Sequence, residues 1–371
     1  MNERTEELRL RVAAALARKF SPLQLHEVRK RFGSLWKALA APKGELTSIK
    51  GITISKISLL KETLASGAVE KELERCAASN TTHLMPEDAG YPRLLKEIAD
   101  PPVVLWMRGT LTDEDQLCVA IVGSRNADYY GMQQAARFSR DLGARRITVV
   151  SGLARGIDTA AHTATLEAGG RTIAVVGSGF DELYPPENVR LAKEIEKQGA
   201  LVSEFPLATP AHAKNFPQRN RIISGLCAGV IVAQATKRSG SLITARFASE
   251  QGREVFAIPG KIDSGEHEGC HALIKEGAKL VENVGDVLAE LHGLDQLPAE
   301  AAPPREKQAF KGTAAELALY TLLKPSDPVN VETLIASSGM PAAQVNATLM
   351  TLEMRKLVHQ LPGKNYVRTG P

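Results

Sequence analysis

Small residues and one guanidinium follow an apolar, β-branched run at residues 147–150, in the stretch SGLARGID at residues 151–158. The run predicts a buried strand, and the small residues behind it, Gly152 among them, let the backbone turn sharply into a helix. Such a turn lies at the carboxyl end of its strand, where open α/β sheets bind ligands. Free backbone N–H groups and the planar fork of Arg155 suit phosphate. The stretch therefore predicts an anion site and leaves the anion open.

Other predicted strands, at 118–122, 172–176, 200–203, 229–233 and 254–258, are also followed by turns rich in glycine, hydroxyls or cations. Parallel strands end at one rim, so these turns should line one trough. The glycines could serve only to let the backbone turn tightly, but that need does not explain the cations and hydroxyl groups beside them. Several arginines on one rim favour a polyphosphate or phosphodiester ligand. The cations expected in the trough are Arg125, Arg155, Arg219, Arg221, Lys237 and Lys261.

Familiar cofactor motifs are absent from the sequence. No turn matches the P-loop pattern, and neither glycine-rich turn at 123–125 or 177–179 completes the dinucleotide fingerprint. The four cysteines are far apart, without a C-x-x-C pair or a Cys/His cluster, so we expect small buried apolar side chains in a reducing cytosol. We therefore expect neither a cofactor nor a metal.

Acid–base chemistry has one candidate pair, Asp158 and His162, which are four residues apart and share one helix face. They could be a catalytic pair or a hydrogen-bonded pair that fixes the turn above them. Glu204 and Asp181 could also reach the trough, but no nucleophile with a base and an orienting group stands out. The sequence predicts a binding protein without catalytic residues, not an enzyme.

The elements that must position these turns fill a chain of 371 residues with 43% hydrophobic residues, enough for two or three domains. The net charge of +4 is mild, so a nucleic-acid surface would be a local groove. A charged N-terminus and the lack of a long uncharged stretch predict a cytoplasmic protein without membrane insertion. Strands that alternate with helices predict an α/β fold with a mostly parallel, Rossmann-like sheet.

Three segments of the sequence differ in their residue pattern and are expected to form domains. Residues 1–80 read as a small helical domain of the SAM or helix-hairpin-helix kind; the hairpin near 49–57 has Thr53 at its second glycine position, so DNA contact and plain packing both stay open. Residues 81–292 should form the extended Rossmann domain and 293–312 a linker. Residues 313–371 have the layout of a winged helix, which could contact duplex DNA or protein.

The motifs at 119–125, 151–158, 161–162, 177–185, 203–206, 216–226, 239–245 and 255–260 together resemble the DprA/Smf family of bacterial DNA-processing proteins. The resemblance is strong over residues 80–290. It implies an extended Rossmann domain that binds single-stranded DNA, protects incoming strands during natural transformation and helps to load RecA, usually as a homodimer.

Carried over to this sequence, the resemblance makes Arg125 a main phosphate contact and Lys214 a second basic contact. Phe216 and Tyr184 are the candidate stacking surfaces. Roughly three or four neutralised phosphates would make binding strongly salt-dependent. The full set expected to bind DNA is Ser124, Arg125, Gly152, Arg155, Lys214, Asn215, Phe216, Arg219, Asn220, Arg221, Lys237, Ser239, Gly240, Ser241 and Thr244.

Two alternatives remain. One is a nucleotide-processing enzyme related to phosphoribohydrolases, whose Pro-Gly-Gly-x-Gly-Thr turn carries a catalytic arginine and glutamate; the nearest stretch here, 239–244, lacks that pair. The other is a winged-helix transcription regulator with a ligand-sensing core, which would prefer a specific duplex.

Overall fold

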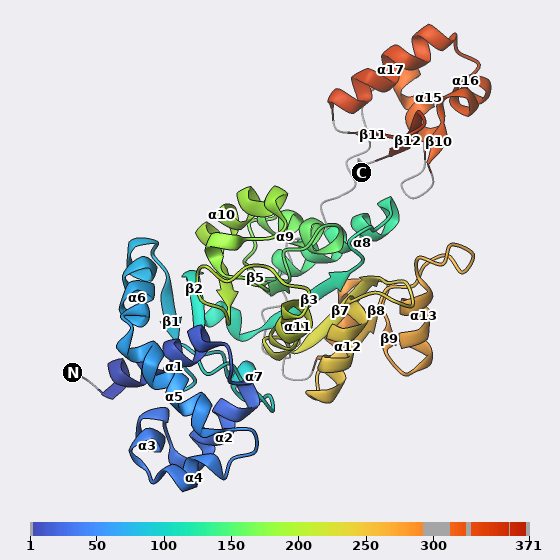
Figure 1. The fold of residues 1–371 in the computed structure, drawn as a ribbon. Helices are drawn as coiled ribbons and strands as arrows, with labels where there is room; N and C mark the ends of the chain where they lie inside the picture. The colour runs from blue at the N-terminus through green and yellow to red at the C-terminus, as the bar shows by residue number, and fades with distance from the viewer. Residues whose placement is uncertain (1–2, 292–311, 324–327, 356, 369–371) are drawn as a thin grey trace. The chain divides into compact units, whose positions relative to one another are not determined.

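A nine-stranded sheet lies at the centre of the computed structural model, which describes residues 3–291, 312–323, 328–355 and 357–368 (Figure 1). Seven neighbouring strands run parallel, and two antiparallel strands extend one edge, which confirms the predicted mostly parallel sheet. In spatial order the strands are β1 (Thr82–Leu84), β2 (Leu105–Gly109), β6 (Ala200–Ser203), β5 (Thr172–Val176), β4 (Thr148–Ser151), β3 (Cys118–Gly123), β7 (Gly229–Gln234), β8 (Glu254–Ala257) and β9 (Lys279–Leu280).

Helices cover both faces of the sheet, because its central strands are apolar on both sides. In β3, Val119 and Ile121 pack on one face, whereas Ala120 and Val122 pack on the other. The first face is covered by α8 (Tyr129–Gly143), α9 (Ile157–Glu167), α10 (Val189–Gln198) and α14 (Val284–Glu290). The second is covered by α7 (Arg93–Lys96), α11 (Asn215–Gly225), α12 (Ser241–Glu250) and α13 (Glu268–Lys275).

The strand order reverses between β3 and β7. From β3 the chain adds β4, β5 and β6 outward in one direction, and α11 then returns it to β7, which lies on the other side of β3. The helices that follow β3 and β7 leave toward opposite faces of the sheet. This divergence leaves a crevice outside the carboxyl ends of the two strands, the place where doubly wound sheets bind ligands.

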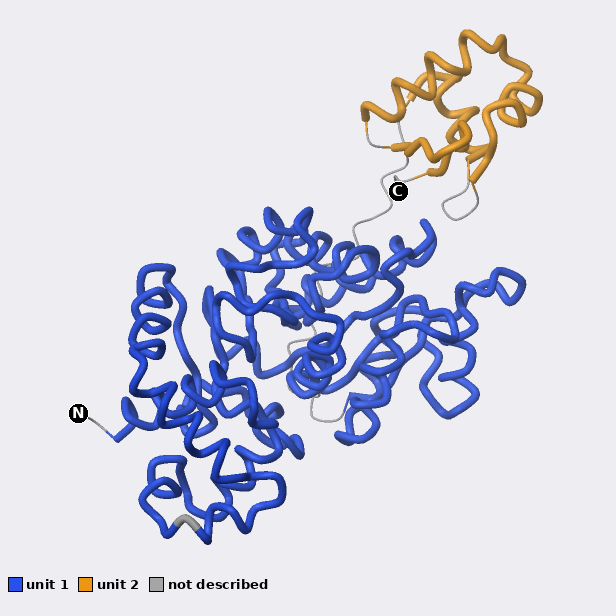
Figure 2. Tube along the Cα trace, viewed as in Figure 1, with its two compact units in different colours: residues 1–298 blue, residues 299–371 orange. Residues whose placement is uncertain are grey.

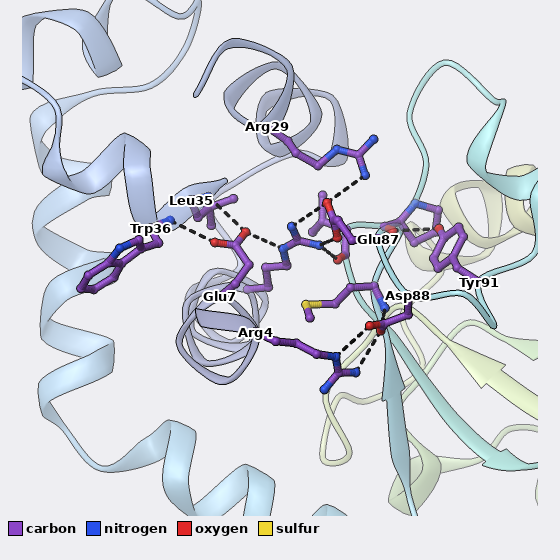
Figure 3. A network of polar contacts seen from close by, with 12 residues as sticks. Arg4, Glu7, Arg29, Leu35, Trp36, Glu87, Asp88 and Tyr91 are labelled. Carbon is purple, nitrogen blue, oxygen red and sulfur yellow. Dashed lines mark hydrogen bonds and ion pairs between the residues drawn. The ribbon is translucent and has the colours of Figure 1, made fainter. Parts of the chain in front are cut away.

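Six N-terminal helices, which we call the helical layer, pack against the β2–β6–β5 side of the sheet. The buried guanidinium of Arg11 ties them to it: it bonds Glu7 at 2.7 Å, Glu87 at 2.8 Å and the carbonyl oxygen of Val103 at 2.8 Å (Figure 3). The helices are α1 (Glu3–Ala17), α2 (Pro22–Phe32), α3 (Leu35–Ala40), α4 (Lys43–Thr47), α5 (Ile54–Ala65) and α6 (Ala68–Ala78).

The predicted hairpin joins α4 to α5. Gly51 has a φ of +81°, and Gln24 of α2 donates a hydrogen bond to the neighbouring carbonyl oxygen of Lys50 at 3.3 Å. The helical layer and the sheet belong to one compact unit, residues 1–298, and the remaining residues form a second (Figure 2). The predicted linker at 293–312 lies outside the described residues, apart from its last residue.

The second unit is a winged helix, as predicted. Its own core contains Leu319, Leu334 and Leu349. The elements are α15 (Ala314–Leu322), β10 (Val329–Asn330), α16 (Val331–Ser338), α17 (Ala342–Met354), β11 (Val358–Leu361) and β12 (Asn365–Arg368).

The four cysteines are buried and free of disulfide bonds, as expected of small apolar side chains. Within the described ranges, none of the helices has the length and apolar character needed to cross a membrane.

Candidate nucleic-acid interface

A cleft of about 470 Å³, which we call the rim cleft, opens at the carboxyl ends of β3, β4 and β7. Four segments that are far apart in the sequence meet there: the turns after these three strands and the first turns of α11. Its polar lining comprises Ser124, Arg125, Asn126, Asp158, Arg219, Asn220, Thr236, Ser239, Ser241 and Thr244.

Arg125 is the exposed cation of the rim cleft. Its guanidinium lies over the ring of Phe216, 5.0 Å from the centroid, and forms no ion pair or side-chain hydrogen bond with any other described residue. The ring holds the guanidinium by a cation–π contact, which leaves its N–H groups available. Arg125 can therefore bind an anion without first breaking a bond within the protein.

Arg219 lies beneath the same ring, with its guanidinium carbon 5.9 Å from the centroid of Phe216, but is only 4% exposed. Its Nη1 donates to the carbonyl oxygen of Gly152 at 2.6 Å and to that of Val175. Burial lowers the pKa of Arg219 to about 10, an effect that the nearby Asp158 opposes, so the group stays charged at neutral pH. Arg219 supports the floor of the rim cleft, and any side chain at Gly152 would collide with it.

Asp158 and His162 do not bond each other, so the prediction of a hydrogen-bonded pair is wrong. The Asp158 carboxylate accepts the N–H groups of Gly152 at 3.1 Å and Ala154 at 3.2 Å, and burial raises its pKa. The His162 Nδ1 lies 2.7 Å from the hydroxyl of Thr172, and burial lowers the pKa of His162 to about 3. Asp158 stands in the first turn of α9 and bonds the turn before the helix, whereas His162 lies one helical turn further on and bonds β5, so the two groups act through separate bonds.

The opposite wall of the rim cleft is the N-terminus of α12. Ser239 and Ser241 share a hydrogen bond of 2.7 Å between their hydroxyls, and Asn220 donates to the carbonyl oxygen of Gly240 at 3.4 Å. The N–H groups of Ser241, Leu242 and Ile243 bond Ser239 and Gly240, so this wall offers an anion its hydroxyl groups and the positive end of the α12 dipole. Arg125 and the start of α12 thus face the same space from two sides.

Three predicted cations lie outside the rim cleft and bond carboxylates. Arg221 is buried and holds Asp100 at 2.9 Å and Glu204 at 2.6 Å, so the structure does not bring it to the trough. Exposed Arg155 pairs with Glu187, and Lys237 lies 3.3 Å from Glu268. Lys261 is likewise absent from the lining.

Two residues at the start of α11 are also placed elsewhere. Asn215 is buried and donates to the carbonyl oxygen of Gly177 at 3.0 Å, so it holds two turns together. Lys214 is exposed and lines a different cleft. Asn126, Thr236 and Ile243 also line the rim cleft but were not among the residues predicted to bind DNA. Asn126 ends a predicted turn and Thr236 adjoins one, so their position was the available signal; Ile243, an apolar residue in a helix, gave none.

Known proteins resemble this chain in sequence and in fold. The family model of DNA recombination-mediator protein A matches residues 82–292, and that of the DprA winged helix domain matches residues 298–364. The Escherichia coli protein Smf is 44% identical over 293 residues, 77% of each chain. The DNA processing protein DprA of Streptococcus pneumoniae is 50% identical over 203 residues, 55% of this chain and 72% of the relative.

Two solved structures are also similar. The crystal structure of Streptococcus pneumoniae DprA has a TM-score of 0.66 at 39% identity and covers 76% of this chain and 96% of its own. That of DNA processing protein A from Helicobacter pylori, described for its single-stranded DNA binding mode, has a TM-score of 0.51 at 29% identity. It covers 57% of this chain and 97% of its own.

Proposed function

Because the chain belongs to the DNA recombination-mediator protein A family, whose bacterial members include DprA and Smf, we propose that it binds single-stranded DNA in the rim cleft. In this proposal it protects strands taken up during natural transformation and helps to load RecA onto them. The family's description as a recombination mediator supports the RecA step, because a mediator must pass its strand to a recombinase. The same membership supports a homodimer that acts in the cytoplasm.

The observation that carries the proposal is the free guanidinium of Arg125 on the ring of Phe216, opposite the N-terminus of α12. A single strand is held by cations that follow its phosphates and by aromatic rings on which its bases stack. Arg125 would contact one phosphate, and the part of the Phe216 ring that neither guanidinium covers would contact a base. Ser124, Asn220 and the α12 wall of Ser239, Gly240, Ser241 and Thr244 would contact neighbouring phosphate or sugar oxygens.

The buried arginines have a different part in this proposal. Arg219 would position the turn that carries Gly152, and Arg221 would hold α11 in place through its two carboxylates. Arg155, Lys214 and Lys237 are exposed at the margins and would add contacts to a longer strand. Arg155 and Lys237 would first have to break their ion pairs with Glu187 and Glu268, which reduces the binding free energy that each can contribute.

The side chains of the winged helix argue against recognition of a duplex sequence. In winged helices of the helix-turn-helix kind, a second helix enters the major groove and reads bases with polar and basic side chains. The corresponding helix, α17, has the sequence AAQVNATLMTLEM, without lysine or arginine. We therefore propose protein contact as the role of this unit, which weighs against a duplex-reading regulator.

A paired binding experiment tests the proposal. Labelled single-stranded and duplex oligonucleotides of one length are titrated with the full chain and with a chain shortened after residue 292. We expect both chains to prefer the single strand, and the full chain to accelerate RecA filament formation on it. Equal affinity for the duplex would refute the binding proposal. Release of free base from nucleoside monophosphates would instead support the enzyme alternative.

A further inference from the structure

A second cleft, of about 340 Å³, lies where the helical layer meets the sheet, and we call it the junction cleft. The end of α1 and the start of α2 form one wall. The segment 204–206 and the first turns of α11 form the other. Its lining includes Arg18, Phe20, Phe205, Lys214, Asn215 and Gln218.

The helical wall of the junction cleft is fixed to the segments that lead into the sheet. Arg11 of α1 lines this cleft and is 1% exposed. It donates hydrogen bonds to Glu7 in its own helix, to Glu87 and to the carbonyl oxygen of Val103 (Figure 3). Arg29 and Arg4 add ion pairs to Glu87 at 3.4 Å and to Asp88 at 2.7 Å. The groove is therefore a built feature of the unit and not a gap between loosely joined parts.

The charge of the junction cleft is positive. Arg18 and Lys214 are exposed, and neither forms an ion pair or a side-chain hydrogen bond with another described residue. The one carboxylate in the lining, Glu204, is already bonded by Arg221 at 2.6 Å and by Gln218 at 2.8 Å. An anion entering the cleft meets two available cations and a carboxylate whose charge is compensated.

Aromatic rings stand beside these cations. Phe20 and Phe205 both line the cleft and are half-buried, so part of each ring is accessible. Two free cations with two accessible rings are the combination by which proteins hold single strands without reading their sequence.

The two clefts meet at the start of α11. Phe216 and Pro217 line the rim cleft, whereas Lys214, Asn215 and Gln218 line the junction cleft. Successive residues of one helical turn point to different sides, so this turn forms the ridge between the clefts. A strand that leaves Phe216 across the ridge arrives at Lys214.

We propose that the junction cleft is a second subsite for the same DNA strand, in which Arg18 and Lys214 bind phosphates and Phe20 or Phe205 packs against a base. The helical layer is then part of the DNA-binding surface. This inference rests on the proposed function, since it extends the path of a strand already bound in the rim cleft.

A length series of oligothymidylates tests it, with affinity measured by fluorescence anisotropy. Arg18 has a φ of +51°, so Arg18→Asn removes the charge with a residue that tolerates this backbone. We expect Arg18→Asn to leave short oligomers unaffected and to weaken long ones about fivefold at 0.1 M salt, with a salt slope smaller by about 0.7. Phe20→Leu keeps an apolar side chain but removes the ring, and should also weaken only long oligomers.

Lys37→Gln is the matched control, because it removes one exposed charge from α3, which lines neither cleft. Unchanged binding by Arg18→Asn at every length, or an equal loss with Lys37→Gln, overturns the inference. If the wild-type chain binds no single strand, or if Arg125→Ala has no effect, the proposed function itself fails. Thermal unfolding of each variant identifies any loss that comes from misfolding.

Discussion

The sharpest prediction concerns Arg125→Ala. Because this guanidinium is exposed and forms no ion pair within the described chain, its removal should leave the fold and its stability essentially unchanged. Among the described residues, the side-chain interaction lost is the cation–π contact with Phe216, worth about 0.5–1 kcal/mol at an exposed site. Any larger effect of the substitution should therefore appear in DNA binding.

The size of that effect can be worked from the contact. A hydrogen bond to a charged group contributes about 1.5–3 kcal/mol, so the affinity for a single strand at 0.1 M salt should fall roughly 10- to 100-fold. Each phosphate contact adds about 0.7 to the slope of log affinity against log salt. The wild-type chain has the steeper slope, so raising the salt from 0.1 to 1 M weakens its binding about fivefold more than it weakens that of the variant. The difference in affinity between the two chains should therefore shrink about fivefold.

Fluorescence anisotropy over a salt series measures both quantities. Arg140→Ala is the control: Arg140 is an exposed arginine in the last turn of α8, so it lies at the other end of that helix from the rim cleft. We expect its affinity and slope to match those of the wild type. A wild-type salt slope in Arg125→Ala, with affinity unchanged, would show that the arginine contacts no phosphate and refute the assignment.

Three further substitutions or treatments separate structural roles from binding. Arg221→Leu leaves two carboxylates without their buried partner, so we expect about 3 kcal/mol less stability in urea unfolding, with unchanged affinity for short single strands that reach only the rim cleft. His162 has its pKa lowered to about 3 by burial, so only the unfolded state binds its proton near pH 5; the wild type should lose about 2 kcal/mol of stability from this group between pH 7 and pH 5. His162→Asn can still donate a hydrogen bond to Thr172, and the variant should lose less stability than the wild type between pH 7 and pH 5. An equal loss in the two chains would mean that another group causes the pH dependence. Burial raises the pKa of the Cys76 and Cys270 thiols to about 12, so Ellman's reagent at pH 8 should label no cysteine until denaturant is added.

Local pattern was enough to place the central strands. The predicted strands at 172–176 and 200–203 coincide with β5 and β6, and that at 147–150 differs from β4 (Thr148–Ser151) by one residue. Buried parallel strands are continuous β-branched runs closed by turn residues, so their signal is local. The two-residue strand β9 and the three-residue strand β1 carried no such run and were missed.

The roles of the arginines could not be read in the same way. Arg125, Arg219 and Arg221 all follow or open predicted turns, yet only the first is an available cation. Arg219 is committed to carbonyl groups 44 and 67 residues away, and Arg221 to a carboxylate 121 residues away. Such partners depend on the tertiary fold, so the sequence places an arginine near a rim without showing whether its charge is already used.

The helical layer and the sheet share one hydrophobic cluster, which joins Val12 and Val69 to Trp106 and Leu201. Because both layers bury their side chains in this one cluster, unfolding either layer exposes the apolar surface of the other. We therefore expect residues 3–291 to unfold as one cooperative body. A ligand that binds only the folded form stabilises it by an amount that grows with the logarithm of the ligand concentration relative to Kd. DNA held in the rim cleft should therefore protect amides in α1 and α2 from hydrogen exchange as strongly as those in β3, even where it touches neither helix.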